Sequence, residues 1–117
     1  MMSFGVMGGA FQPLGHVQIV MNIVDFGLNI QEAGDFPRIN HEGSSEPTGE
    51  GMAPKGGMIT LESGYPYDVI RELMQKGHQV GYINGMYGGY QAIRWDPVRK
   101  VYFGASESRK DGQAAGY

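Results

Sequence analysis

The chain has 117 residues and no cysteine, which bounds it to about one domain-sized core and excludes disulfides, thiol catalysis and thiolate metal sites. Its hydrophobic fraction of 41% and charged fraction of 18% are those of a folded globular protein rather than a disordered one. The formal net charge is −3 and the sequence has no basic block. This argues against binding to nucleic acid or to an anionic membrane surface, because both require clustered Lys and Arg residues.

A short strand and a glycine-rich turn are predicted at the beginning of the chain. Residues 3–7, Ser-Phe-Gly-Val-Met, predict a buried strand that ends at Gly8 and Gly9. Pro13 and Gly15 predict another turn directly after this glycine pair.

Residues 16–30 predict a helix with an unusually wide apolar surface. One face holds Val17, Val20, Met21, Val24 and Leu28. A narrow polar stripe holds Gln18, Asn22, Asp25 and Asn29. We therefore expect neighbouring layers to cover this helix on most sides. The polar stripe and the short length argue against a membrane span, and we expect no signal peptide because no charged segment precedes an apolar one.

A helical turn and a long loop are predicted next. Residues 31–35 continue the helical pattern until Gly34 and Pro37 stop it. From His41 onwards the sequence is rich in Gly, Ser, Pro and Glu and has almost no large apolar residue. We expect a flexible loop over residues 42–57, and loops of this length are either functional or disordered.

The rest of the chain alternates between strands and one helix. Strands are predicted at residues 58–62, 79–83, 89–95 and 100–104, with a hairpin turn at 96–99 and a polar tail at 105–117. Residues 66–76 predict an amphipathic helix with Pro66 in its first turn and Glu72 spaced to pair with Lys76. Its expected buried face holds Val69, Ile70, Leu73 and Met74. Mixed elements with an antiparallel hairpin predict one layered α+β domain over 1–117.

Motifs for metal, phosphate or nucleophilic chemistry are weak. His16, His41 and His78 are far apart, and the acidic residues near His41 (Glu42, Glu46 and Glu50) have no diagnostic metal spacing, so we expect no metal. The serines of residues 43–49 have no marked base. Residues 85–89 predict a wide turn between strands rather than a phosphate loop, because no Lys follows them.

Two further residue types have structural interpretations. Methionines 21, 52, 58, 74 and 86 predict core filling rather than a docking face. Arg38, which follows Pro37, predicts a structural ion pair rather than a substrate clamp.

Several short blocks, in the same order over nearly the whole chain, resemble the gamma-glutamyltransferase family (also called gamma-glutamyltranspeptidase or glutathione hydrolase). The blocks include Gly-Val-Met-Gly-Gly-Ala-Phe-Gln-Pro at 5–13, Asp-Phe-Gly at 25–27, Pro-Arg at 37–38, Leu-Glu-Ser-Gly at 61–64, Gly-Gly-Tyr-Gln-Ala-Ile at 88–93 and Gly-Ala-Ser-Glu-Ser-Arg at 104–109. Each block is weak alone, and the ordered set carries the resemblance. It implies the C-terminal part of the family's small subunit, a piece of the αββα sandwich of the Ntn hydrolases.

The resemblance also implies a threonine enzyme that needs no cofactor. In the family, an autocatalytic cut makes a Thr the first residue of the small subunit. Its hydroxyl attacks a gamma-glutamyl amide with its own α-amino group as base, and the acyl group passes to water or to an amine or peptide acceptor. Paired glycines supply the oxyanion hole, and they match Gly8 and Gly9, which otherwise predict only a tight turn.

The residue that would do the chemistry is expected to be missing. The family's Thr lies well upstream of the glycine pair, whereas Thr48 and Thr60 lie downstream and match no nucleophile motif. We therefore expect a fragment that is inactive alone and whose partners are the N-terminal part of the small subunit, the large subunit and, in the full enzyme, a gamma-glutamyl peptide.

The alternative interpretation is a non-catalytic module. Unpaired strand edges and uncovered helix faces invite self-association, so we expect a homo-oligomer when the chain is isolated. The compartment stays open between the cytoplasm and the periplasm or extracellular space.

Overall fold

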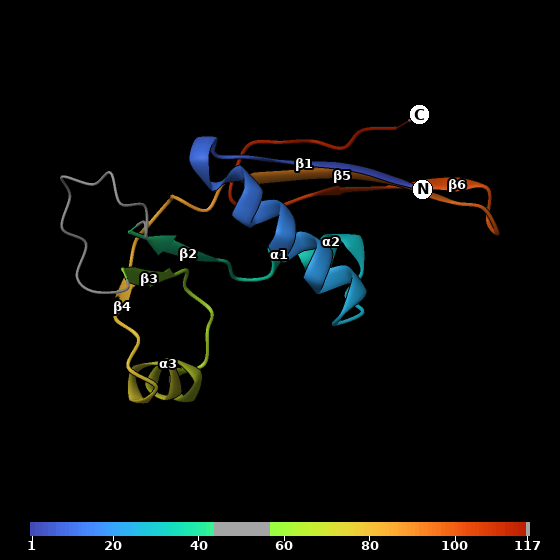
Figure 1. Ribbon diagram of the computed structural model, residues 1–117. Helices are drawn as coiled ribbons and strands as arrows, with labels where there is room; N and C mark the ends of the chain where they lie inside the picture. Colours follow the sequence, from blue (N-terminus) through green and yellow to red (C-terminus); the bar gives the residue numbers. More distant parts are fainter. Residues whose placement is uncertain (44–56, 117) are drawn as a thin grey trace. The chain divides into compact units, whose positions relative to one another are not determined.

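The computed structural model describes residues 1–43 and 57–116, which fall into two compact units (Figure 1). The first unit comprises Met1–Phe36 and Gly85–Tyr117, and the second comprises Pro37–Asn84. The first unit combines a small sheet with helices and the second combines a small sheet with a helix, which confirms the α+β class. The expectation of a single domain over 1–117 stays a prediction. Among the described residues, no helix has the length and apolar character needed to cross a bilayer.

The sheet of the first unit has three antiparallel strands in the order β1-β5-β6. They are β1 (Met2–Met7), β5 (Gly89–Asp96) and β6 (Val101–Ser106), and the last two form the predicted hairpin. The predicted strand at 3–7 is confirmed, but it is not buried throughout. Only Val6 is buried, because side chains alternate between the two faces of a sheet and the helices cover one of them.

Two α-helices lie against this sheet (Figure 1). A short 3₁₀ turn, η1 (Gly9–Phe11), leads into α1 (Gln12–Val24), and α2 (Ile30–Asp35) follows. The predicted turn at Pro13 and Gly15 is wrong, because Pro13 occupies the first turn of α1, where no N–H is needed. The predicted helix over 16–30 also ends early. Gly27 has φ +68°, and the Asn29 side chain caps α2.

The buried face of α1 differs from the predicted one. Val17 is 53% exposed and Val24 is 72% exposed, although both belong to the expected apolar face. Asn22, from the expected polar stripe, is only 7% exposed, and its Nδ2 donates to the Ala33 carbonyl at 3.3 Å. The buried core residues of the unit are Val6, Phe11, Ile19, Ile30, Tyr87, Tyr90, Ala92 and Ala105.

The second unit has a three-stranded sheet in the order β2-β3-β4. Strands β2 (Ile39–Glu42) and β3 (Met58–Leu61) are antiparallel, whereas β3 and β4 (Val80–Tyr82) are parallel and joined through α3 (Tyr67–Gln75). Strand β2 was not predicted. The structure places His41 and Glu42 in this strand and not in the expected loop. The β3–β4 pair is parallel because a helical crossover returns the chain in the same direction. Residues 44–56 of the expected loop lie outside the described residues.

Helix α3 confirms the predicted element but not its buried face. The Lys76 Nζ atom lies 2.7 Å from a Glu72 carboxylate oxygen, as the spacing predicted. Pro66 is the N-cap rather than a first-turn residue. No residue of α3 is buried, and Met74 is 58% exposed.

The predicted core role of the methionines is likewise wrong at three positions. Met21, Met74 and Met86 are all exposed, while Met58 is half-buried. Met52 lies outside the described residues.

Candidate functional site

The glycine pair that follows β1 has a backbone that few other residues adopt. Gly8 has φ +146° and Gly9 has φ +57°, both in the region where a Cβ is unfavourable. Their carbonyl groups start the helical segment: Gly8 O accepts from Phe11 N at 3.1 Å, and Gly9 O accepts from Gln12 N. The carbonyls therefore point into the helix, and the conformation favours glycine at both positions.

The N–H groups of the same two residues are available as donors. Neither donates a hydrogen bond to another described residue, and both residues are exposed. Adjacent backbone donors at the beginning of a helical segment suit a negative charge, because the first N–H groups of a helix have no partner inside it. The structure thus leaves two adjacent donors at the predicted site residues, Gly8 and Gly9, and their role in binding an oxyanion stays a prediction.

Gly88 packs against the peptide bond that carries the first of these donors. A Cβ at Gly88 would overlap the Met7 carbonyl oxygen and would lie 2.9 Å from Val6 Cγ1. A Cβ at Gly8 would in turn lie 3.3 Å from Gly88 Cα. Because the Met7 carbonyl and the Gly8 N–H belong to one planar peptide unit, the close approach of Gly88 fixes the direction of the Gly8 donor.

The sequence predicted a wide turn around Gly88, and the structure confirms it between β4 and β5. Gly88 has φ +73°. Its contact with Met7 was missed because the two residues are far apart in the sequence. The Gly-Gly pair at 88–89, one of the blocks behind the family resemblance, was the available signal.

Aromatic packing in the core supports the turn at the glycine pair. The Phe11 and Tyr87 rings meet edge to face, with centroids 6.2 Å apart. Gly15 in α1 allows this packing, because a Cβ there would lie 2.8 Å from Val6 Cγ1 and 2.9 Å from Phe11 Cε1. These contacts anchor the glycine pair to the core of the first unit.

Two other candidate residues, Thr60 and Arg38, belong to the second unit. Thr60 is fully buried in β3, and its hydroxyl donates a hydrogen bond of 3.4 Å to the Asn40 carbonyl. Thr48 lies outside the described residues. Arg38 is 1% exposed, and its backbone N–H donates to Glu62 Oε2 at 2.9 Å. Its predicted ion pair stays a prediction.

The three histidines belong to different elements: His16 to α1, His41 to β2 and His78 to the segment after α3. His16 Nδ1 lies 2.6 Å from the Gln12 carbonyl oxygen within α1. In the part of the chain that the structure describes, no three His, Asp or Glu side chains are grouped to hold a metal ion. Of the acidic residues near His41, Glu46 and Glu50 lie outside that part.

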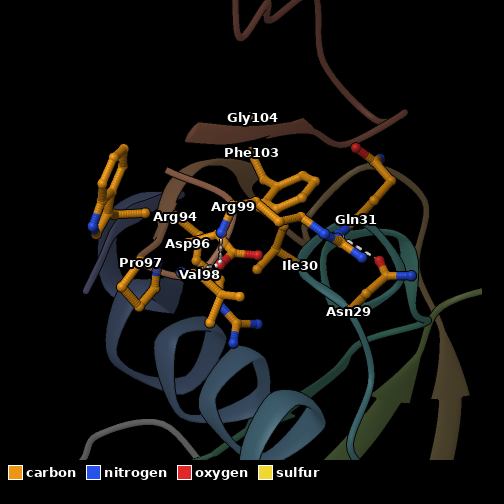
Figure 2. Close-up of a pocket in the computed structure, with 11 residues that line it drawn as sticks. Asn29, Ile30, Gln31, Arg94, Asp96, Pro97, Val98, Arg99, Phe103 and Gly104 are labelled. Carbon is orange, nitrogen blue, oxygen red and sulfur yellow. Dashed lines mark hydrogen bonds between the residues drawn. The ribbon is translucent and has the colours of Figure 1, made fainter. Parts of the chain in front are cut away.

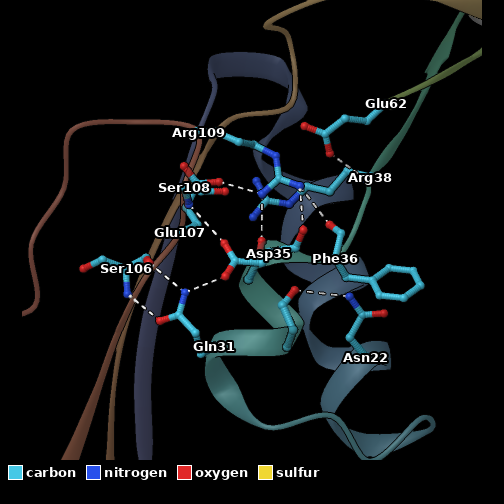
Figure 3. Close-up of polar contacts among 12 residues, drawn as sticks. Asn22, Gln31, Asp35, Phe36, Arg38, Glu62, Ser106, Glu107, Ser108 and Arg109 are labelled. Carbon is cyan, nitrogen blue, oxygen red and sulfur yellow. Dashed lines mark hydrogen bonds and ion pairs between the residues drawn. The ribbon is translucent and has the colours of Figure 1, made fainter. Parts of the chain in front are cut away.

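The predicted polar tail is tied firmly to α2 (Figure 3). Arg109 donates to three carbonyls at the end of this helix: Nη1 to Gly34 O at 2.8 Å, and Nη2 to Phe36 O at 2.9 Å and Asp35 O at 3.3 Å. Its Nη1 also pairs with the Glu107 carboxylate at 2.8 Å, and the Glu107 side chain is fully buried. The guanidinium thereby satisfies carbonyls that the helix leaves unpaired.

A second set of bonds joins the same elements through Asp35 and Gln31 (Figure 3). The Asp35 carboxylate accepts from Ser108 N at 3.0 Å and from Gln31 Nε2 at 2.7 Å. Gln31 also bonds the backbone N–H and carbonyl of Ser106. Burial raises the pKa of Asp35, but hydrogen bonds from Gln31 and Ser108 outweigh it and leave the pKa below its ordinary value.

This polar network involves α2, the helix that packs against Tyr90 of the sheet. It holds α2 where Gly34 lies against the Tyr90 ring, since a Cβ at Gly34 would lie 2.6 Å from Tyr90 Cε1. In the sheet, Tyr90 pairs with Val6, and Val6 lies two residues before Gly8 in the chain. The residues of the network were missed because they are more than 70 positions apart in the chain.

Comparison with known proteins gives consistent matches. The family described as Gamma-glutamyltranspeptidase matches residues 1–117. The glutathione hydrolase proenzyme of Escherichia coli K12 is 32% identical over 102 residues, which are 86% of this chain and 15% of that protein. The crystal structure of a cephalosporin acylase from Bacillus halodurans has a TM-score of 0.79 and 38% identity, covering 97% of this chain and 19% of that one.

A further solved structure gives the same fold. An acivicin-inhibited gamma-glutamyltranspeptidase has a TM-score of 0.75 and 26% identity, covering 95% of this chain and 54% of that one. The chain thus spans between 15% and 54% of the length of the proteins that it matches here.

Proposed function

Because the chain belongs to the gamma-glutamyltranspeptidase family, we propose that it supplies the oxyanion-binding part of an enzyme that cleaves amide bonds by acyl transfer. The family is one of enzymes, and the solved relatives confirm the predicted Ntn-hydrolase fold class. The observation that carries the proposal is the glycine pair: Gly8 and Gly9 are exposed residues whose N–H groups have no partner among the described residues, in positive-φ conformations that favour glycine.

In the proposed reaction, a hydroxyl nucleophile adds to the amide carbonyl carbon. Its proton passes to a base, and the carbonyl π electrons move onto oxygen. The N–H groups of Gly8 and Gly9 donate to this oxyanion, which they stabilise more than they stabilise the neutral carbonyl. When the C=O bond re-forms, the C–N bond breaks and the amine leaves with the proton. Water or an acceptor amine then repeats the sequence on the acyl-enzyme.

The nucleophile is proposed to come from a polypeptide segment outside these 117 residues. Thr60 cannot serve, because it is fully buried and donates to the Asn40 carbonyl. By analogy with the relatives, the partners are the preceding part of the small subunit and the large subunit. The substrate is a gamma-glutamyl amide, as the glutathione hydrolase relative suggests, with other N-acyl amides as second choice because another relative is a cephalosporin acylase.

The test measures release of 4-nitroaniline from gamma-glutamyl-4-nitroanilide. We expect no release above background from the 117-residue chain, and release from a protein in which this chain is joined to the preceding segment and the large subunit. The Gly8→Ala substitution in that protein should lower kcat by about 100-fold or more. Hydrolysis by the 117-residue chain alone, or an unchanged kcat for Gly8→Ala, contradicts the proposal.

A second function, self-association, is favoured by one observation. On α1, the apolar residues that the sequence placed in the core are exposed, with Val24 at 72% and Val17 at 53%. Such surfaces drive association when no partner covers them. We propose that the isolated chain is a homo-oligomer. Light scattering coupled to size exclusion should give a mass of at least two chains. A compact monomer contradicts this proposal and leaves the proposed oxyanion-binding role unaffected.

A further inference from the structure

The first unit contains a pocket, whose lining residues are drawn in Figure 2, at the end of β5 that is opposite to the glycine pair. It has a volume of about 620 Å³ and lies between the beginning of α2 and the β5–β6 hairpin. Its position follows from the alternation of β5. Tyr90 and Ala92 are buried under the helices, and Arg94 and Asp96 continue the same face beyond them. The volume is within the range of small-molecule sites, about 300–1,000 Å³.

The charge of the pocket comes from two arginines. Arg94 and Arg99 both line it, and neither guanidinium forms an ion pair or hydrogen bond with another described residue. The acidic residue of the lining, Asp96, is turned to the backbone: its Oδ1 accepts from Val98 N at 2.8 Å and Arg99 N at 3.1 Å. The Arg99 N–H bond chiefly keeps the pKa of Asp96 below its ordinary value, and the positive charges of Arg99 and Arg94 lower this pKa further. The pocket lining therefore carries two cations and one carboxylate, which leaves an excess of positive charge.

The base of the pocket is apolar and flat. Ile30 is 6% exposed, and Phe103 lies directly across the sheet from Arg94. The Arg99 guanidinium carbon is 6.0 Å from the centroid of the Phe103 ring. A guanidinium over an aromatic ring keeps the edge of its fork for a planar anion such as a carboxylate.

The two amides at the rim have different capacities. Gln31 is committed, because its Nε2 donates to Asp35 and to the Ser106 carbonyl and its Oε1 accepts from Ser106 N. Asn29 uses only its Oδ1, which accepts from Gln31 N and Glu32 N at 2.9 Å. The Asn29 Nδ2 group is therefore left to donate to a ligand.

From this arrangement we propose that the pocket binds a small organic carboxylate that carries a flat apolar group. The carboxylate bonds the guanidinium groups of Arg94 and Arg99 with help from Asn29, and the apolar group lies on Phe103 and Ile30. The site is separate from the proposed oxyanion hole: Gly89 of β5 pairs with Met7 beside Gly8, whereas Asp96 is at the far end of the strand. Ligands at this site therefore need not compete with the amide substrate.

The test compares benzoate with its neutral isostere, benzamide, by isothermal titration calorimetry on the 117-residue chain. We expect benzoate to bind with a dissociation constant below about 10 mM and benzamide at least tenfold more weakly. The fluorescence of Trp95, the sole tryptophan in the sequence and part of the lining, should change with benzoate. Equal binding of the two compounds, or no binding of benzoate, overturns the proposal.

Paired substitutions assign the charge. Arg94→Gln and Arg99→Gln should each weaken benzoate binding at least tenfold. Arg71→Gln on α3 removes the same charge from an exposed position outside the pocket and should leave the affinity unchanged. Circular dichroism confirms that each variant is folded. Equal weakening by Arg71→Gln would indicate a general charge effect and overturn the assignment.

Discussion

Gly88→Ala is the substitution that most sharply separates strain in the backbone from damage to the proposed oxyanion hole. Gly88 has φ +73°, where a non-glycine residue costs about 1–2 kcal/mol. The added Cβ would also overlap the Met7 carbonyl oxygen. To restore an ordinary C···O contact of about 3.3 Å, the Met7 oxygen must move by roughly 1 Å. Since the Gly8 N–H is part of that peptide unit, the donor moves with it.

The expected effect follows from these magnitudes. A displacement of about 1 Å in a catalytic group can cost on the order of 100-fold in rate, similar to the loss of one oxyanion donor. We expect Gly88→Ala to lower kcat for gamma-glutamyl-4-nitroanilide by about 100-fold with little change in KM, because the donor acts chiefly in the transition state. The assay uses the protein that contains this chain together with the nucleophile-bearing segment.

Gly85→Ala is the matched control in the same turn. Gly85 has φ +83°, so alanine is strained there to a similar degree, but a Cβ at Gly85 meets no atom within 4 Å. Both variants should unfold at a lower temperature than the parent, while only Gly88→Ala should lose most of its kcat. Equal loss of kcat in the two variants would contradict a displaced Gly8 donor, because strain alone would then account for the effect.

Three further predictions concern the polar network and the exposed helix face. Arg109→Met should destabilise the fold by roughly 3 kcal/mol in urea unfolding, because it leaves the buried Glu107 carboxylate without this ion pair; a loss under 1 kcal/mol contradicts this. Asp35→Asn should be less stable than the parent near pH 7. The difference in the free energy of unfolding should shrink as the pH falls below 3.8, because the lowered pKa of Asp35 makes its stabilisation present above that value and lost below it. A difference that stays constant down to about pH 2.5 refutes the assignment. Val24→Glu should shift the isolated chain towards monomer in light scattering, whereas Val98→Glu, at an 89% exposed hairpin position, should not; an unchanged mass for the first variant removes α1 from the interface.

The sequence predicted most local elements because local patterns determine them. The β5–β6 hairpin, the strand at β3 and the amphipathic character of α3 follow from residue alternation, turn residues and helical spacing. The facing of α1 could not be derived in the same way. Apolar residues surround most of this helix, so periodicity does not select a side. Asn22 faces inward because the Ala33 carbonyl, from the next helix, accepts its hydrogen bond.

The candidate site shows the same division between local and long-range information. Gly8 and Gly9 predict a turn locally, and their proposed role came only with the family resemblance. The contact of Gly88 with Met7 and the bonds from Arg109 to the end of α2 join distant segments of the chain. No local pattern encodes such contacts, because a tight turn and a donor-orienting turn use the same glycine residues.

The central claim is that the backbone N–H groups of Gly8 and Gly9 bind the oxyanion of a reaction whose nucleophile another segment supplies. The most direct measurement is a crystal structure of the assembled enzyme with a tetrahedral adduct on that nucleophile. We expect the adduct oxygen within about 2.7–3.1 Å of both nitrogen atoms. An oxygen bound by other donors, with Gly8 and Gly9 facing solvent, would contradict it.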